Sequence, residues 1–229
     1  MFWLAPDDLR FPPVHYGPAD APLAVGGDLS AARLVRAYSL GIFPWYNEPP
    51  ILWWSPDPRM VLAPNDLRIN RSLRRALRTN TLRVSFDTAF PAVIRACAAP
   101  RKDQAGTWIT TEIIAAYEEL FALGFAHSVE CWSDGHLVGG VYGVAIGGAF
   151  FGESMFSTVN NASKIAFVEL VAALRERGFA LIDCQVASPH MAALGASAIA
   201  RSRFLAQLEM AIALPIAPGS WRACVGISS

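Results

Sequence analysis

Apolar residues recur with helical and then with strand spacing from about residue 61 onward. Runs with helical spacing that follow a capping residue predict helices. One such run lies earlier in the chain, where an apolar stripe includes Leu34 and Tyr38. Asp28 or Ser30 can cap that helix, and Gly41 ends it. The other helices are expected at residues 70–78, 88–98, 111–123, 161–177 and 202–213.

The middle of the chain alternates as strands do. A strand at 127–132, an Asp-Gly turn and further strands at 136–144 and 149–156 predict an antiparallel meander. Another apolar strand, 179–186, follows the long helix. A crossover helix between two strands usually makes the later strand pair in parallel. The pattern therefore predicts an α+β fold with a mixed sheet.

The first sixty residues differ in composition from the rest of the chain. Ten of the 16 prolines and four of the seven tryptophans lie before residue 61. Proline at this density excludes long helices and central strands. The chain is therefore expected to have a small, loop-rich N-terminal domain at 1–60 and a larger mixed-sheet domain at 61–229.

Composition narrows the function classes. The 229 residues are 53% hydrophobic and 17% charged, which is enough to bury a core. Lys plus Arg and Asp plus Glu are both 19, so no overall positive field draws the protein to nucleic acid. A contact with nucleic acid must come from a local patch. The longest apolar run, 137–151, is too short and too rich in glycine to span a bilayer.

Cysteine usage and the start of the chain indicate a cellular location. The four cysteines are far apart and lack metal-ligand spacing, so they are expected to be reduced thiols rather than disulfides or a zinc site. No basic residue precedes the apolar part of the first ten residues, unlike a secretory signal. We therefore expect a cytoplasmic protein without a metal, and nothing demands more than a monomer.

Two polar residues end an apolar strand, at Asp183 and Gln185. Alternation along a strand places both on one face and Cys184 on the other. Burying an acid and an amide there without partners is costly. The pair is either a structural hydrogen-bond pair between strand and loop or a functional polar cluster, and spacing alone leaves both open.

A third polar residue, Glu153, lies among three phenylalanines and a methionine. An unpaired carboxylate in such surroundings is expensive. Its partner is therefore either another group of the protein or a cationic substrate.

Arginines cluster in a short stretch without acids. No Asp or Glu lies between residues 67 and 86, and arginine is the only basic residue there. Such a run is usually a solvated face, but guanidinium groups without lysines also suit phosphates. The candidates for phosphate contact are Arg68, Arg71, Arg74, Arg75, Arg78 and Arg83.

Two aromatic segments, 41–46 and 51–59, are rich in proline and tryptophan. Clusters of this kind mostly brace loops, but exposed tryptophans also stack on bases or line apolar pockets.

The motifs taken together resemble the leucyl/phenylalanyl-tRNA–protein transferase family over the whole chain. The matching segments are Val25–Ser30, Gly41–Trp45, Leu52–Arg59, Gly106–Thr110, Ala126–Glu130, Leu137–Gly140, Tyr142–Val144, Gly152–Ser157, Asn161–Lys164 and Leu181–Gln185.

That resemblance implies an activity and a fold. Members move Leu or Phe, and less readily Met, from charged tRNA onto proteins that begin with Arg or Lys, which creates an N-degron for proteolysis. The resemblance also implies a small N-terminal domain followed by an acetyltransferase-like (GNAT-like) domain. No cofactor is implied, because an aminoacyl ester is already activated.

The resemblance assigns roles to residues of this chain. Asp183 would polarise Gln185, whose amide oxygen takes a proton from the attacking α-amine, with Glu153 close to the reacting groups. Trp45 and Trp108 would hold the terminal adenosine. The pocket for the transferred side chain would include Val141, Phe150 and Met155, and the arginines at 71–83 would meet the tRNA.

The chain departs from the family pattern at two positions. Ala193 stands where many relatives have Ser, and Val141 where a longer Met is familiar. The shorter side chain at 141 is expected to widen the pocket and alter the preference between Leu and Phe.

Two other functions compete with this interpretation. An acetyl-CoA-dependent N-acyltransferase would need a glycine-rich pyrophosphate turn, which 158–163 does not offer. A non-catalytic RNA-binding module would explain the arginines and tryptophans but would leave the polar residues at 153, 183 and 185 without a role.

Overall fold

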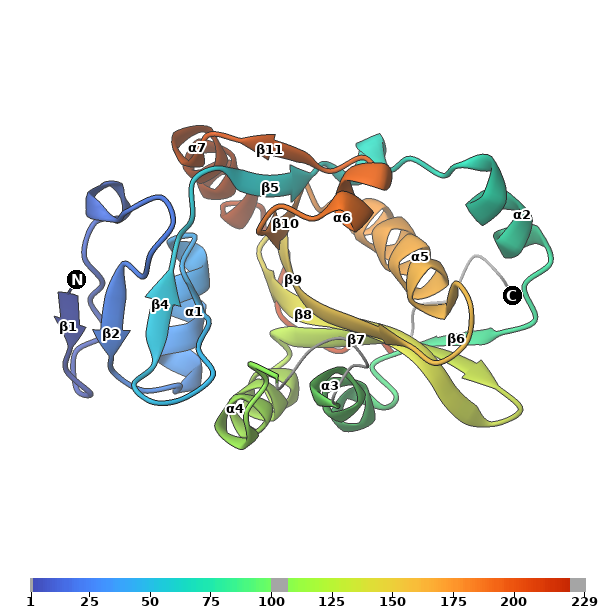
Figure 1. Ribbon diagram of the computed structural model, residues 1–229, viewed down its shortest axis with the longest axis horizontal. Helices are drawn as coiled ribbons and strands as arrows, with labels where there is room; N and C mark the ends of the chain where they lie inside the picture. The colour runs from blue at the N-terminus through green and yellow to red at the C-terminus, as the bar shows by residue number, and fades with distance from the viewer. Residues whose placement is uncertain (1, 100–106, 223–229) are drawn as a thin grey trace.

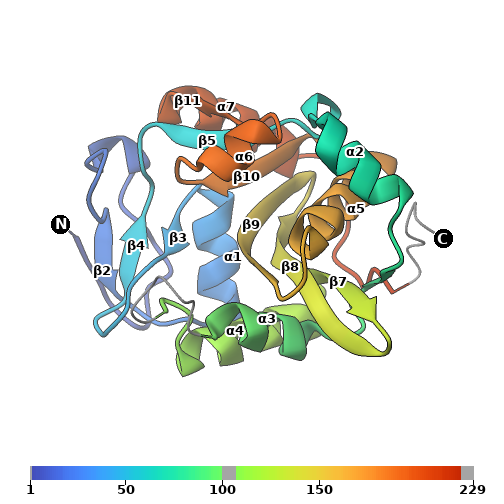
Figure 2. The same cartoon turned by 45° about the vertical axis from the view of Figure 1, so that its right-hand side comes forward.

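The computed structural model describes residues 2–99 and 107–222 and has the expected α+β composition, arranged around two sheets (Figure 1). The first sheet has four strands in the order β1-β2-β4-β3. The second has seven strands in the order β11-β5-β10-β9-β8-β7-β6. Figure 2 shows α1 between the small sheet and the large one.

The small sheet is built from very short strands, so its alternation is too brief to show in the sequence. The expected helix is present as α1 (Ala31–Ser39), and the Ser30 side chain caps it by accepting from the backbone N–H of Arg33. Gly41 ends it with φ at +72°. The strands are β1 (Phe2–Leu4), β2 (Ala24–Gly26), β3 (Phe43–Pro44) and β4 (Leu52–Trp54), with a 3-10 turn at Val14–Tyr16.

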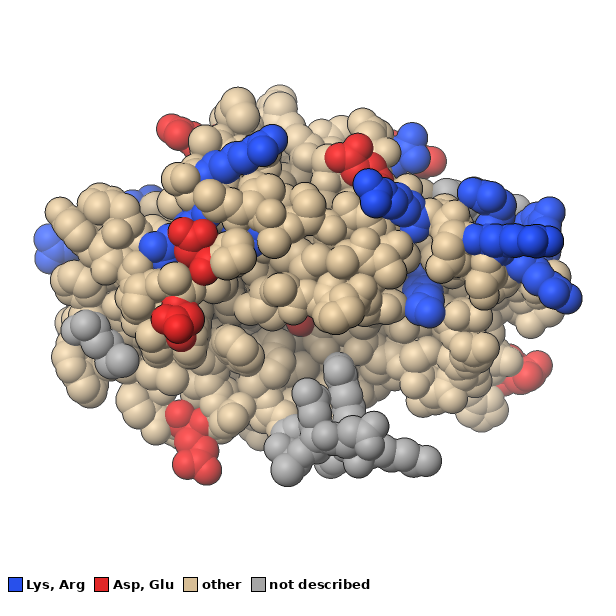
Figure 3. Space-filling view, turned by 45° about the horizontal axis from the view of Figure 1, so that its top comes forward, with Lys and Arg blue, Asp and Glu red and all other residues tan. Residues whose placement is uncertain are grey.

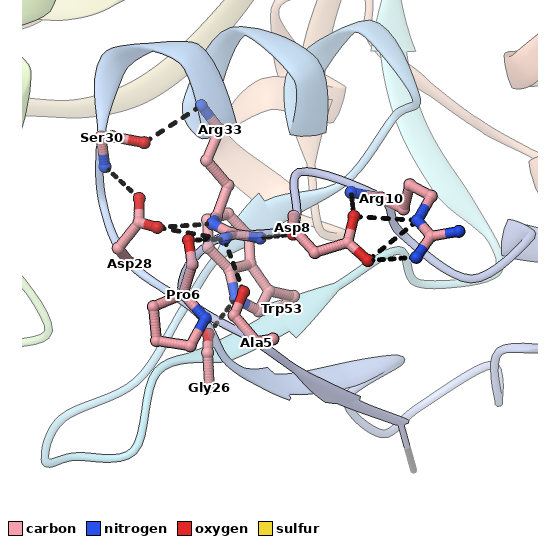
Figure 4. A network of polar contacts seen from close by, with 9 residues as sticks. All are labelled: Ala5, Pro6, Asp8, Arg10, Gly26, Asp28, Ser30, Arg33 and Trp53. Carbon is pink, nitrogen blue, oxygen red and sulfur yellow. Dashed lines mark hydrogen bonds and ion pairs between the residues drawn. The ribbon is translucent and has the colours of Figure 1, made fainter.

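A buried arginine holds the N-terminal segment onto α1. The Arg33 side chain is fully buried and pairs with Asp28 at 3.0 Å. Its guanidinium also donates to the carbonyl oxygens of Ala5, Pro6 and Asp8 at 2.8 to 2.9 Å (Figure 4). These contacts satisfy the donors of a charge that would be costly to bury alone.

The large sheet contains the expected meander. Three strands, β7 (Ala126–Ser133), β8 (His136–Ile146) and β9 (Ala149–Ser157), pair antiparallel in sequence order. After the long helix the chain returns as β10 (Leu181–Gln185), which pairs with β9 in parallel as predicted. Sequence patterning did not reveal the remaining strands, β5 (Arg59–Leu62), β6 (Arg83–Phe86) and β11 (Ser197–Ile199).

The expected helices are present within one or two residues of their predicted ends, and they cover both faces of the large sheet. α5 packs on one face, whereas α3 and α4 pack on the other (Figures 1 and 2). Each face consequently has its own apolar core. The expected helices are α2 (Arg71–Arg78), α3 (Phe90–Ala98), α4 (Thr111–Ala122), α5 (Ala162–Glu176) and α7 (Arg201–Ile212). The short helix α6 (Pro189–Ala193) and a 3-10 turn at Pro64–Asp66 were not predicted.

α3 begins two residues later than predicted, because a buried carboxylate accepts hydrogen bonds from the backbone amides just before it. Glu130 of β7 accepts from the backbone N–H groups of Thr88 and Ala89 at 3.4 and 3.3 Å. The Ser85 hydroxyl also donates to Glu130 at 2.6 Å. An acid at a helix N-terminus satisfies free amides and complements the helix dipole.

Two further sets of contacts join segments that are distant in the sequence. Asp87 accepts from the backbone N–H of Trp221 at 2.7 Å and contacts His127, whose ring stacks on Trp221. Arg201, at the start of α7, donates to the carbonyl oxygens of residues 17, 18 and 55. The second contact ties the N-terminal segment to the last helix.

No helix among the described residues is long and apolar enough to cross a membrane. Among the described residues, Cys97, Cys131 and Cys184 form no disulfide bond, and Cys224 lies outside the described residues, as does Gly106.

We expect Gly143→Ala to lower the free energy of unfolding by about 1–3 kcal/mol, as overpacking does. A Cβ at Gly143 would lie 2.2 Å from the Phe151 carbonyl oxygen and 2.6 Å from the Phe150 ring. The control is Gly219→Ala, where a Cβ meets nothing within 4 Å. Urea denaturation of both variants measures the difference, and equal midpoints would contradict the close contact between β8 and β9.

Candidate active site

A cavity of about 960 Å³ lies where the two sheets meet. Its aromatic wall comes from the small sheet and the loop after β3, including Trp45, Tyr46 and Trp54. The opposite wall comes from β9 and β10 and includes Glu153 and Gln185. Among the described residues that line it, Glu153 is the single acidic side chain, and none is a lysine or an arginine.

Glu153 is held by neutral donors of the protein. The Tyr38 hydroxyl donates to Oε1 at 2.8 Å, and the Tyr117 hydroxyl donates to Oε2 at 3.2 Å. The two tyrosine hydroxyls also contact each other. The side-chain amide of Gln185 donates to Oε1 at 2.8 Å. Of the two alternatives left open by the sequence, the structure therefore shows internal partners for this carboxylate.

Burial governs the ionisation of Glu153. Removal from water raises the pKa of Glu153 to about 7, although the hydrogen bonds from Tyr38, Tyr117 and Gln185 work in the opposite direction. The charge of nearby Asp183 raises it further. The carboxyl group is therefore poised to change its charge close to neutral pH.

Asp183 and Gln185 do not follow simple strand alternation. Gln185 has φ at +62°, and the pairing of β10 with β5 shifts register between residues 183 and 185. This irregularity brings both Cys184 and Gln185 to the cavity, whereas Asp183 is fully buried behind it. Cys184 packs against the core that contains Ile182, whereas the Gln185 side chain bonds to Glu153.

The Asp183 carboxylate contacts the backbone rather than the side chain of Gln185. Its Oδ1 accepts from the Gln185 backbone N–H at 2.8 Å. Both of its oxygens accept from the Arg59 guanidinium, at 2.8 and 2.6 Å. Asp183 is thus an ion-paired group in the core, and Gln185 is the member of the pair that reaches the cavity.

The three residues expected around the transferred side chain all line the same cavity. Val141 on β8 is 2% exposed and Phe150 on β9 is 1% exposed, while Met155 is partly exposed. Apolar walls of this kind select ligands by shape and size more than by charge.

The two predicted tryptophans also line the cavity. Trp45 is 39% exposed, and its ring lies 5.2 Å from that of Trp54, which donates through Nε1 to the Trp45 carbonyl oxygen. Trp108 is partly buried and follows the segment that the structure does not describe. These rings give the cavity a broad face on which a flat ligand can stack.

The arginines of α2 lie on the surface. Arg71, Arg74, Arg75 and Arg78 are exposed, and the helix buries Leu73 instead. Figure 3 shows basic side chains gathered at the end of the molecule where α2 lies. Arg83 on β6 is also exposed and lies over the Trp132 ring at 5.2 Å.

The structure thus brings seven of the predicted site residues to one cavity and places Asp183 directly behind it. Sequence reasoning missed three residues that hold this centre: Tyr38, Tyr117 and Arg59. Tyr38 was counted in an apolar helical stripe, and a hydroxyl on such a stripe gives no separate signal. Arg59 is the last residue of the matched segment Leu52–Arg59, but its ion-pair partner lies 124 positions further along the sequence.

The described residues contain no group of three or more His, Cys, Asp or Glu side chains arranged to hold a metal ion.

Comparisons with known proteins point to one family. The family model described as leucyl/phenylalanyl-tRNA protein transferase matches residues 61–209, and the model of its N-terminal domain matches residues 27–57. The leucyl/phenylalanyl-tRNA–protein transferase of Alkalilimnicola ehrlichii is 58% identical over 97% of this chain and 88% of its own. The proteins of the same name from Nitrosospira multiformis and Pseudomonas putida are 57% and 55% identical, over 90% and 97% of this chain and 90% and 99% of theirs.

We expect Glu153→Gln to stabilise the protein more at pH 8 than at pH 5. The folded-state pKa of about 7 lies above the ordinary carboxyl value of 4.5, so the wild-type carboxyl contributes stability at low pH that is lost as the pH rises through 7. The Gln side chain does not ionise, so it adds no such dependence of stability on pH. Thermal unfolding at both pH values measures the difference from wild type. The control, Glu209→Gln, removes an exposed carboxylate from α7. A difference that does not change with pH would contradict the raised pKa.

Proposed function

Because the chain belongs to the leucyl/phenylalanyl-tRNA–protein transferase family, and is therefore an aminoacyltransferase with a charged tRNA as donor and a protein as acceptor, we propose that the reaction takes place beside Glu153 and Gln185. The observation that carries this assignment is their direct hydrogen bond of 2.8 Å at the wall of the cavity. It places an oriented amide next to a carboxylate whose pKa lies near 7.

Gln185 is the proton acceptor in this proposal. With its Nε2 donating to Glu153, the amide keeps its oxygen as the remaining acceptor. The acceptor's α-amine has a reference pKa of about 8, so a sizeable neutral fraction exists near pH 7. A weak base is then sufficient if the amine is well placed, because positioning can remove about 7–11 kcal/mol of the barrier.

The bond changes are simple. The α-amine nitrogen attacks the ester carbonyl carbon and forms the new peptide bond, and the ester C–O bond to the terminal ribose breaks. The amine loses a proton toward the Gln185 oxygen, and the ribose oxygen leaves as a hydroxyl after gaining a proton. The aminoacyl ester supplies the driving force, so the step uses no covalent enzyme intermediate.

Glu153 places the acceptor protein. We assign to it the recognition of proteins that begin with Arg or Lys, because it is the single acid among the described residues of the cavity wall. Its ionised form attracts the cationic side chain of the acceptor's first residue, and its partly buried position strengthens that attraction.

The donor occupies the rest of the cavity. Leu, Phe or, less readily, Met lies between Val141, Phe150 and Met155, and the terminal adenosine stacks on Trp45 and Trp108. An apolar pocket separates side chains that differ by a methylene by only about 1–3 kcal/mol, which suits acceptance of several donors. Leucyl-, phenylalanyl- and methionyl-tRNA are therefore the proposed substrates.

The body of the tRNA contacts the arginine surface. The exposed side chains at 71, 74, 75 and 78 on α2, with Arg83, offer several phosphate forks on a protein whose formal net charge is zero. This surface supplies affinity without reading sequence.

The broader organisation follows the same proposal. Residues 1–60 and 61–229 form an N-terminal domain and a GNAT-like catalytic domain, and the enzyme acts as a cytoplasmic monomer. The meander, crossover helix and parallel return of β10 support the GNAT-like assignment. β5 begins at Arg59 and so reaches across the boundary.

We expect Gln185→Ala to lower turnover at least about 100-fold while tRNA affinity stays within about twofold, since general-base groups contribute about 10²–10⁴-fold. The assay measures transfer of labelled leucine from charged tRNA to reporters beginning with Arg, Lys or Ala, and filter binding measures affinity. Gln207→Ala on α7, which lines no part of the cavity, is the control. Binding without any transfer by the wild-type protein would instead favour a tRNA-binding module.

We expect Val141→Met to lower transfer of Phe relative to Leu by about 10-fold, because the longer side chain reduces the room beside Phe150. Competition between leucyl- and phenylalanyl-tRNA measures the ratio. Val35→Met on α1, outside the cavity wall, is the control. An unchanged ratio would remove Val141 from the side-chain pocket.

A further inference from the structure

We propose that Arg59 is a positioning residue for the transfer reaction, and that it acts through Asp183 on the backbone, rather than the side chain, of Gln185. The inference rests on the proposed function, since Gln185 is taken as the reacting amide. It gives Asp183 a different task from polarising that amide.

The first step is a two-pronged ion pair. Arg59 Nε and one terminal nitrogen donate to the two oxygens of Asp183, and both side chains are fully buried. A fork of this kind sets the plane of the carboxylate as well as its distance. The pair also joins the first residue of β5 to the middle of β10.

The second step is the clamp around the guanidinium. Its carbon lies 4.8 Å from the ring centre of Phe43 and 4.5 Å from that of Phe204. Phe43 belongs to the small sheet and Phe204 to α7. One terminal nitrogen of Arg59 is buried without a hydrogen-bond partner. The aromatic rings, and not a full set of acceptors, therefore hold the group in place.

The third step reaches the backbone of Gln185. Oδ1 of Asp183, which Arg59 orients, accepts the Gln185 N–H at 2.8 Å. Gln185 has the left-handed φ of +62°, at the register shift against β5. Side-chain-bearing residues rarely adopt this conformation, so it persists only where surrounding contacts hold it. The oriented carboxylate is such a contact.

The last step leads into the cavity. The left-handed turn directs the Gln185 amide to Glu153, where Nε2 donates to Oε1. Asp183 itself does not line the cavity. Its contact with the reacting amide therefore passes through one backbone N–H, in addition to the effect of its charge on Glu153.

Stability alone does not account for this ion pair. A buried pair is often replaced by well-packed apolar residues without loss of stability, whereas removing one partner leaves an uncompensated charge. The apolar clamp of Phe43 and Phe204 would accommodate such a replacement. What the apolar pair could not supply is the acceptor for the Gln185 N–H.

The test replaces the whole pair, with the double variant Arg59→Met/Asp183→Leu in the full chain. We expect the folded protein to lose about 100-fold in kcat, the loss that a misplacement of about 1 Å can produce, with an unchanged KM for leucyl-tRNA. Adding Gln185→Ala to the double variant should lower kcat little further, because the same amide is already displaced. A merely structural pair would leave kcat per folded molecule unchanged.

Arg33→Met is the matched control. Arg33 is also fully buried and also pairs with an aspartate, but it holds the N-terminal segment and lines no part of the cavity. We expect this variant to lower the thermal midpoint while kcat per folded molecule stays at the wild-type value. Arg59→Lys covers the case in which the double variant does not fold, since it keeps the charge but loses the fork.

The outcomes are distinct. Wild-type kcat in the folded double variant, or in Arg59→Lys if the double variant does not fold, would overturn the positioning role. A loss of kcat that is fully additive with Gln185→Ala would also overturn it. Wild-type protein that transfers no leucine, or a Gln185→Ala variant that transfers normally, would instead refute the proposed function.

Discussion

The arrangement of the cavity depends on the buried ion pair between Arg59 and Asp183. It connects β5 to β10. The Arg59 guanidinium also lies against Phe43 of the small sheet and Phe204 of α7. Removing such a charge pair from water is costly, and the contacts around it offset that cost only in one geometry. This requirement fixes the local path of β10, including the irregular turn at Gln185.

A second constraint concerns the charge of the cavity itself. Glu153 meets only uncharged donors, two tyrosine hydroxyls and one amide, so no cation of the described protein neutralises it at close range. Burial then sets its ionisation and brings the pKa near 7. The negative charge of ionised Glu153 therefore remains available to a cationic ligand. An arginine of the protein at the same place would have neutralised that charge by an ion pair.

The helices and the meander were predictable from the sequence because the elements are long. α5 and β7–β9 each show several repeats of their helical or strand spacing. The small sheet could not be predicted in this way, since strands of two or three residues show at most one alternation. The family resemblance brought Glu153, Gln185 and the aromatic residues together as candidates. It did not reveal that Asp183 lies behind the cavity, because that depends on a left-handed residue and on a partner 124 positions away.

Two arginines hold the N-terminal segment mainly by its backbone. Arg33 grips the carbonyl oxygens of residues 5, 6 and 8, and Arg201 grips those of residues 17, 18 and 55. A carbonyl oxygen is present whatever the side chain, so these loops keep their course while their amino acids are exchanged. The two arginines, in contrast, cannot be replaced without loss of these hydrogen bonds. Insertions or deletions, which displace carbonyl oxygens, are the changes that this segment tolerates least.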